Sequence, residues 1–176
     1  ASQGEIAIGK LAEFFEKRRG KLSGAVFSGG EPTLEPELPA YLELAKFYGL
    51  ATKLDTNGSH PEVLERLIGL KLLDAAGIDF KAPPYKYSQV TGNPGPAVFE
   101  KVMESIRLVR RHKLDCEVRT TVHKSLLTLE DLRAMETCLR QNKVGKWVIQ
   151  MFHEAELIDE RLLGEETYTP GELTAF

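Results

Sequence analysis

The stretch "VFSGGEPTLEPEL" (residues 26–38) joins the end of an apolar strand to two glycines and a charged residue. Gly29 and Gly30 carry no Cβ atom, so a ligand can approach their backbone N–H and C=O groups closely. Glu31 follows directly and can accept hydrogen bonds from a ligand ammonium group. The alternative is a tight turn before a helix, where the helix dipole favours a carboxylate in the first turn. The stretch alone favours neither interpretation.

The composition predicts a globular cytoplasmic protein. Hydrophobic residues make up 42% and charged residues 28% of the 176 residues, and the formal net charge is -3 without a basic stripe. This balance argues against nucleic acid as a partner. The sequence has no apolar run of about 18 residues and no apolar signal-peptide region at its start, so we expect no membrane segment. Cys116 and Cys138 form no close-spaced pair, as is typical of reduced cytosolic thiols.

Strand-like and helix-like segments alternate along the chain. This order predicts an α/β fold with a parallel sheet, open or closed into a barrel. Thr128 and Asp131 form a capping box, and Pro61 is favoured at a first helical position. The segment 81–97 is rich in Pro, Gly and Tyr, which predicts a long functional loop. Strands are expected at 24–28, 51–55, 76–81, 115–122 and 147–152, and helices at 5–19, 36–49, 61–69, 96–112 and 128–142.

Several predicted strands have one apolar and one polar face, unlike the continuous apolar strands of a fully buried parallel sheet. Glu117 and Arg119 share one face of their strand, and Asp79 and Lys81 share one face of another. One interpretation is a solvent-facing antiparallel sheet. The other is a barrel whose partly polar interior holds a ligand, and the intervening helices favour it.

Each predicted strand finishes with a polar or charged residue at the same end. Singly, each has a structural explanation: Asp55 can stabilise a turn, Asp79 can pair with Lys81, and a lone Arg or His is more often structural than functional. Together they favour an active site, because the carboxyl ends of parallel barrel strands are where such sites lie. The residues at the strand ends are Glu31, Asp55, Asp79, Arg119 and His153.

Six phrases of the sequence resemble the radical S-adenosylmethionine (SAM) superfamily. Within it they are most similar to the activating enzymes of glycyl-radical enzymes, specifically the anaerobic ribonucleoside-triphosphate reductase activating proteins. The resemblance covers nearly the whole chain and implies a partial (β/α)6 radical SAM barrel with parallel strands. We accordingly expect a barrel domain over residues 1–159 and a C-terminal tail over residues 160–176. The phrases are "GAVFSGGEPTL", "KLDTNGSHPEVLERL", "IDFKAPPYKYSQVTG", "VFEKVMESIRLV", "CEVRTTVHKSLLTLEDL" and "WVIQMFHEAEL".

The resemblance implies an enzyme with two cofactors, SAM and a 4Fe–4S cluster. Reductive cleavage of SAM would give a 5′-deoxyadenosyl radical, which abstracts hydrogen from a backbone glycine of a partner enzyme. The expected partner is a glycyl-radical enzyme, with anaerobic ribonucleoside-triphosphate reductase as the specific candidate. The expected electron donor is a flavodoxin or a ferredoxin.

The resemblance also implies which residues bind SAM. Gly29, Gly30 and Glu31 would hold its amino-acid end, and His153 would lie near its ribose. The resemblance assigns no catalytic residue and no metal ligand within the chain. The expected cofactor-binding residues are Ser28, Gly29, Gly30, Glu31, Asp55, Thr56, Asn57, Asp79, Lys81, Arg119 and His153.

One feature of the family is absent from the sequence. Three cysteines in a CxxxCxxC motif hold the family's cluster, whereas this chain has two cysteines and no such motif. Cys116 and Cys138 are expected to be core residues. We expect the cluster loop and the first strand to lie upstream of residue 1. Two alternatives remain open: a radical SAM enzyme that acts on another small molecule or protein, and a cluster-less SAM-binding or structural module.

Overall fold

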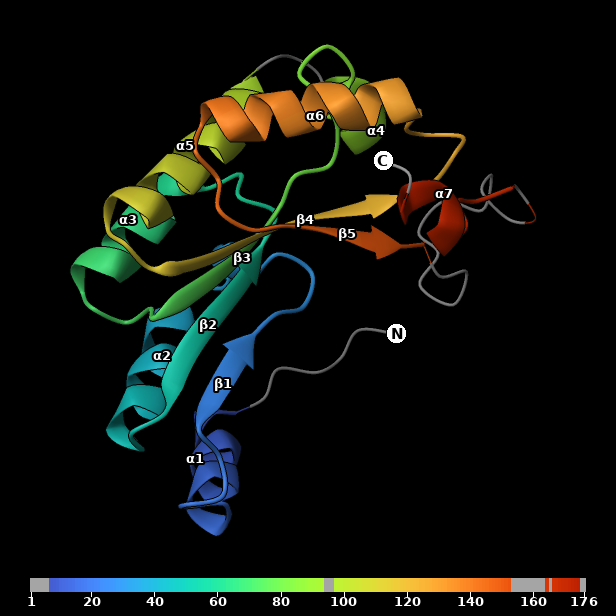
Figure 1. Cartoon of the computed structure of the whole chain (residues 1–176). Coiled ribbons are helices and arrows are strands. Elements are labelled where there is room, and N and C mark those ends of the chain that lie inside the picture. Colours follow the sequence, from blue (N-terminus) through green and yellow to red (C-terminus); the bar gives the residue numbers. More distant parts are fainter. Residues whose placement is uncertain (1–6, 94–96, 153–163, 165, 175–176) are drawn as a thin grey trace.

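The computed structural model describes residues 7–93, 97–152, 164 and 166–174. Its centre is one five-stranded sheet with the order β1-β2-β3-β4-β5, in which every neighbouring pair is parallel. The sheet is curved and open on one side (Figure 1). It confirms the predicted parallel α/β architecture of a partial barrel. The strands are β1 Gly24–Phe27, β2 Ala51–Thr56, β3 Ala75–Asp79, β4 Asp115–Val122 and β5 Trp147–Met151.

A predicted helix lies between each strand and the next. Two sequence signals place helix starts correctly: Pro61 is the first residue of α3, and both bonds of the Thr128–Asp131 capping box are formed at α6. Three short elements were not predicted, because a single helical turn shows no periodicity. The predicted helices are α1 Ile8–Lys17, α2 Leu38–Phe47, α3 Pro61–Gly69, α5 Ala97–Arg111 and α6 Leu129–Gln141; the others are η1 Pro32–Leu34, α4 Tyr87–Thr91 and α7 Pro170–Thr174.

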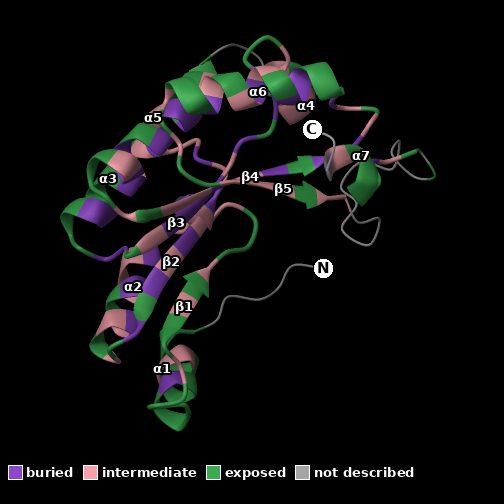
Figure 2. Ribbon diagram, in the orientation of Figure 1, coloured by how far each residue is buried: buried purple, intermediate pink, exposed green. Residues whose placement is uncertain are grey.

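Helices cover one face of the sheet and leave the other face open (Figure 1). Buried residues lie on the central strands and on the sheet-facing sides of the helices (Figure 2). In β2, burial alternates, with Leu54 fully buried and Asp55 only partly covered. The alternation arises because successive side chains of a strand point to opposite faces. The structure therefore confirms an apolar helix-facing side and a polar side on the same strands.

Strand β1 forms one edge of the sheet. Among the described residues it pairs with β2 alone, and Val26 on the polar face is 60% exposed. Such an edge offers unpaired backbone N–H and C=O groups to a further strand. Of the helices in the described ranges, none combines the length and apolar character needed to cross a bilayer.

The described part of the C-terminal tail packs against the turn that follows β4. Tyr168 is buried, and its hydroxyl donates to the backbone carbonyl of Leu127 at 2.8 Å. Lys124 forms ion pairs with Glu166 and Glu172 at 2.7 and 2.8 Å. The predicted boundary at residue 159 falls outside the described residues and stays a prediction.

Asp131 connects the loop after β3 to the start of α6. Its carboxylate accepts hydrogen bonds from the Tyr85 hydroxyl and the Lys86 ammonium group, both at 2.8 Å, and from the backbone N–H and hydroxyl of Thr128. Burial opposes the charge, but these bonds outweigh it and lower the pKa of Asp131 to about 2. The long loop is therefore held to α6 by a charged carboxylate.

These contacts predict a loss of stability at low pH. Because the folded-state pKa lies below the usual value near 3.8, the stabilisation is complete above that value and disappears as the pH falls toward 2. The parent should lose unfolding free energy as the pH falls from about 5 to about 2. Allowing for solvent screening, we expect this loss to be about 1–2 kcal/mol smaller in Asp131→Asn. Urea unfolding at both pH values measures it. The control is Glu130→Gln, a change of an exposed residue on the same helical turn, whose unfolding free energy should depend on pH as that of the parent does. If the unfolding free energy of Asp131→Asn also depends on pH as in the parent, the prediction is wrong.

Candidate functional site

Arg119 bridges two aspartates that come from two other strands. Its Nη1 donates to Asp55 Oδ2 at 2.7 Å, and its Nη2 donates to Asp79 Oδ1 at 3.1 Å. Asp79 lies beside Arg119 in the β3–β4 register, whereas Asp55 belongs to β2, two strands away. The guanidinium group therefore crosses the whole of β3 on the polar face.

The crossing point on β3 is Gly77. This residue is in register with Asp55 on one side and with Glu117 on the other. A Cβ atom built at Gly77 would press against Asp55 Oδ1 and lie 3.1 Å from Arg119 Cζ. The bridge between Arg119 and Asp55 thus occupies the space that any other residue would fill.

The bridge is strongly charged but its hydrogen bonding is incomplete. Burial opposes the charge of Arg119, yet the hydrogen bond and charge of Asp55 and the charge of Asp79 outweigh it and raise the pKa of Arg119. Asp55 Oδ1 and Arg119 Nε are buried, and neither has a hydrogen-bond partner among the described residues. Asp55 Oδ1 has only an ion pair with Lys53 Nζ at 3.4 Å. Buried polar atoms are usually bonded, so an unbonded donor and an unbonded acceptor in one ion-pair network call for a further partner, such as a polar ligand or an ordered water.

Further charges continue the cluster on both sides. Lys81 Nζ lies 3.3 Å from Asp79 Oδ2, so the predicted ion pair is present together with the bridge to Arg119. Toward the other end of the strands, Glu117 pairs with Lys146 at 2.6 Å and with Lys53 at 3.9 Å. The hydrogen bond from Lys146 is the main cause that lowers the pKa of Glu117. The polar face therefore carries alternating charges of both signs.

Glu31 connects the glycine loop to the end of β2. Its Oε1 accepts hydrogen bonds from the Thr56 hydroxyl at 2.6 Å and from the backbone N–H and hydroxyl of Thr33 at 3.1 and 2.5 Å. Its Oε2 accepts from the backbone N–H of Asn57 at 2.7 Å. The bond to Thr33 caps η1, so the turn-stabilising role is real. Among the described residues, Oε2 accepts this one hydrogen bond, so its second lone pair can accept another from a ligand.

The segment before Glu31 is open to solvent. Ser28, Gly29 and Gly30 are exposed, and no atom lies within 4 Å of a Cβ position at either glycine. Gly29 has φ 142°, a conformation that residues with a side chain rarely adopt. The backbone of this loop is accessible, as the sequence predicts for a loop that a ligand approaches.

The structure sorts the predicted residues into two adjoining clusters, which meet at the consecutive residues Asp55 and Thr56. Asp55, Asp79, Lys81 and Arg119 form one cluster. Glu31, Thr56 and Asn57 form the other, beside the exposed loop 28–30. His153 lies outside the described residues.

Two residues of the site were not among those predicted from the sequence. Thr33 donates to Glu31 twice, but a threonine after a proline carries no signal of its own. Gly77 does carry a signal, since glycine inside a strand often marks a close approach of another group.

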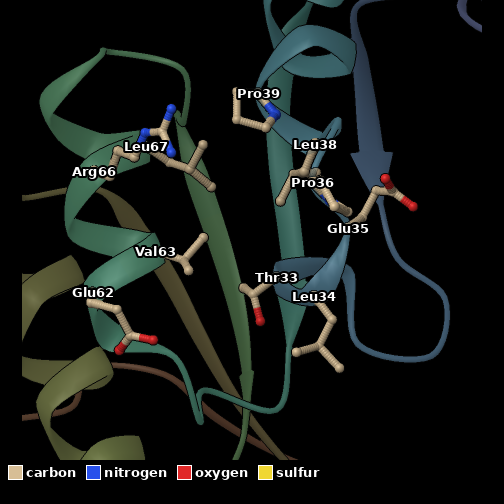
Figure 3. A pocket seen from close by; sticks show the side chains of 10 residues that line it. All are labelled: Thr33, Leu34, Glu35, Pro36, Leu38, Pro39, Glu62, Val63, Arg66 and Leu67. Atoms are coloured by element: carbon tan, nitrogen blue, oxygen red, sulfur yellow. The ribbon is translucent and has the colours of Figure 1, made fainter.

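A separate groove lies on the helical side of the sheet. It has a volume of about 280 Å³, and its lining comes from η1 and α2 on one side and α3 on the other (Figure 3). Thr33 lines it together with exposed Leu34 and with Val63. The groove therefore reaches Thr33, which donates to Glu31, and its lining does not include the residues of the Arg119 bridge.

The two cysteines lie away from the site and pack on the core, as predicted. Burial raises the pKa of Cys116 to about 11 and also raises the pKa of Cys138. A thiol with a raised pKa is a poor metal ligand, because the thiolate form binds metals. These two residues do not fit an iron–sulfur cluster.

Comparison with known proteins identifies the family of the chain. The model of the family "Radical SAM superfamily" matches residues 6–135. A Methanocaldococcus jannaschii protein named "Putative glycyl-radical enzyme activating enzyme MJ1227" is 34% identical over 140 residues, which cover 77% of this chain and 57% of that protein. The chain thus matches little more than half of this curated relative.

Solved structures share the fold at low sequence identity. A domain of pyruvate-formate lyase-activating enzyme from Bacteroides vulgatus has a TM-score of 0.66 and 17% identity over 87% of this chain and 89% of that one. Streptococcus suis SuiB bound to S-adenosylmethionine has a TM-score of 0.71 and 12% identity over 99% of this chain and 40% of that one. With a family model that matches most of its length, the chain belongs to the radical SAM superfamily.

Proposed function

We propose that the protein containing this chain binds SAM through the two clusters and generates a glycyl radical on a partner enzyme. The observation that carries the proposal is the Arg119 bridge. It joins Asp55 and Asp79, near the carboxyl ends of β2 and β3, and leaves one buried donor and one buried acceptor without a hydrogen-bond partner among the described residues. The chain is also 34% identical to a relative named for glycyl-radical enzyme activation. Ligands of parallel barrels bind at this end of the strands.

The charges of the site fit the chemistry of SAM. Its methionyl end carries an ammonium group and a carboxylate, so it needs an acceptor and a donor close together. Glu31 Oε2 has acceptor capacity for the ammonium group, and the backbone of Gly29 and Gly30 is open beside it. Arg119 Nε, in the other cluster, is a buried donor without a hydrogen-bond partner among the described residues. Bonds between opposite charges are about twice as strong as neutral ones, so these residues would dominate the affinity.

The cluster ligands must come from outside these 176 residues. The chain has only two cysteines, both partly buried against the core, whereas a cluster of this kind needs thiolate ligands. We propose that a CxxxCxxC segment precedes residue 1 in the full-length protein. The cluster would supply the electron for cleavage of SAM, and the residues described here would hold and orient SAM.

The proposed partner is a glycyl-radical enzyme, with anaerobic ribonucleoside-triphosphate reductase as the specific candidate and a flavodoxin or ferredoxin as the electron donor. The relative's name supports the partner class. The specific reductase rests on the sequence phrases alone.

The test uses the full-length protein, purified and reconstituted without oxygen. We expect about four irons per chain, SAM binding by calorimetry, and a glycyl radical on the reductase by electron paramagnetic resonance. A protein that does not bind SAM overturns the proposal. SAM binding and SAM cleavage without a radical on the reductase would overturn the choice of partner and favour another substrate.

A further inference from the structure

We infer that Gly77 is a positioning residue of the SAM site, because its missing side chain is what allows Arg119 to reach Asp55. The inference rests on the proposed function, since it assigns the reason why the Arg119 bridge has its observed geometry. Gly77 has no side chain that could form a hydrogen bond, and it lies outside the sequence motifs from which the SAM site was predicted.

The distance across the sheet makes the position of Gly77 critical. Neighbouring strands are about 4.8 Å apart, so Arg119 on β4 must span about 10 Å to reach Asp55 on β2. The direct path passes over the residue of β3 that is in register with Asp55, and that residue is Gly77. A Cβ atom there would collide with Asp55 Oδ1 and would lie 3.1 Å from Arg119 Cζ and 3.2 Å from its Nη1. Nη1 is the atom that donates to Asp55.

Backbone conformation does not explain this glycine. Gly77 is absent from the residues with positive φ, which include Gly29 and Gly58. It lies within β3, between the buried residues Ala76 and Ile78, where glycine is less favourable than alanine by roughly 0.5–1 kcal/mol. The remaining reason is close approach of another group, and the described group at that place is the Arg119 bridge.

A side chain at Gly77 would therefore act selectively. The Asp55 carboxylate would have to move away from the new Cβ atom, and the guanidinium group would have to shift slightly, so the two would separate. Asp79 would stay within reach of Arg119 on β3. Asp55 would then keep only Lys53, at 3.4 Å, as a cationic neighbour. The free donor at Nε would move with the guanidinium group, so the site would lose both its charge balance and its alignment toward SAM.

The test is a double-mutant cycle in the full-length protein, with the parent, Gly77→Ala, Arg119→Ala and the combined variant. If Gly77 acts through Arg119, Gly77→Ala weakens SAM binding roughly tenfold or more, as expected for loss of a hydrogen bond to a charged group. Combined with Arg119→Ala, the same change has less than about a twofold further effect, because the two residues act as one unit. Calorimetry measures the affinities, and melting temperatures of all four proteins give a second readout.

The matched control is Gly69→Ala at the end of α3, where no atom lies within 4 Å of the new Cβ and φ is not positive. It should bind SAM as the parent does. If Gly77→Ala does not fold, the combined variant should fold better, since Asp55 is no longer held by Arg119 and can turn away from the new Cβ atom. Additive effects of the two changes, or parental affinity of Gly77→Ala, overturn the inference. A parent that fails to bind SAM overturns the proposed function instead, while the melting temperatures still test the coupling of Gly77 to Arg119.

Discussion

Arg119→Ala is expected to lower the free energy of unfolding by about 3 kcal/mol, the lower end of the range for breaking a buried ion pair. The reason is that Asp55 and Asp79 both lose their shared cation. The Arg119 and Asp55 side chains are 15% and 14% exposed, so water replaces the lost partner poorly. The lower end of the range applies because Asp79 is 32% exposed and keeps Lys81 nearby.

Chemical denaturation measures this change as a lower midpoint concentration of denaturant, while the slope of the unfolding free energy against denaturant concentration stays constant. The matched control is Arg140→Ala on α6, whose ion pair with Glu136 leaves the arginine side chain 78% exposed. That change should cost less than about 0.5 kcal/mol, as surface pairs do. Arg119→Lys should recover only part of the loss, because an ammonium group cannot reproduce the two-pronged geometry of a guanidinium group. Equal losses for Arg119→Ala and Arg140→Ala would show that the bridge does not stabilise the fold.

Glu31→Ala is expected to weaken SAM binding by about 10- to 150-fold, which corresponds to 1.5–3 kcal/mol for a lost hydrogen bond to a charged group. The change removes the carboxylate that we propose binds the ammonium group of SAM. The change also removes the acceptor for Thr56 and Asn57, so the glycine loop loses its connection to β2. We therefore expect a lower melting temperature in addition to the lower affinity.

Two further variants separate these effects. Glu31→Gln keeps the shape of the side chain and one acceptor oxygen for Thr33 and Thr56 but removes the charge, so it should lose affinity with a smaller change in melting temperature than Glu31→Ala. Glu37→Ala alters an exposed glutamate shortly after the same loop, and it should match the parent in SAM affinity. The iron content should be parental in every variant, since the cluster ligands lie elsewhere. If Glu31→Ala loses stability but binds SAM as tightly as the parent, Glu31 serves only to cap η1 and hold it to β2.

Much of the fold could be predicted from the sequence because its causes are local. The alternation of strand-like and helix-like hydrophobic patterns predicts the strands and the long helices. Pro61 marks a helix start, and Thr128 with Asp131 forms a capping box within one helical turn. The two-faced strands predicted the polar side of the sheet, and two consecutive glycines predicted the open backbone of the loop after the first described strand. Each of these inferences depends on residues a few positions apart.

Only the tertiary structure decided which partners these residues have. Glu31 bonds to Thr56, 25 positions away, and Arg119 reaches Asp55 over 64 positions. Strand periodicity tells which face a side chain occupies, but the choice of partner depends on the register between strands and on how far a side chain can reach across them. Gly77 shows the difference: in the sequence it is a glycine in a strand, and its role follows only from an arginine that crosses above it.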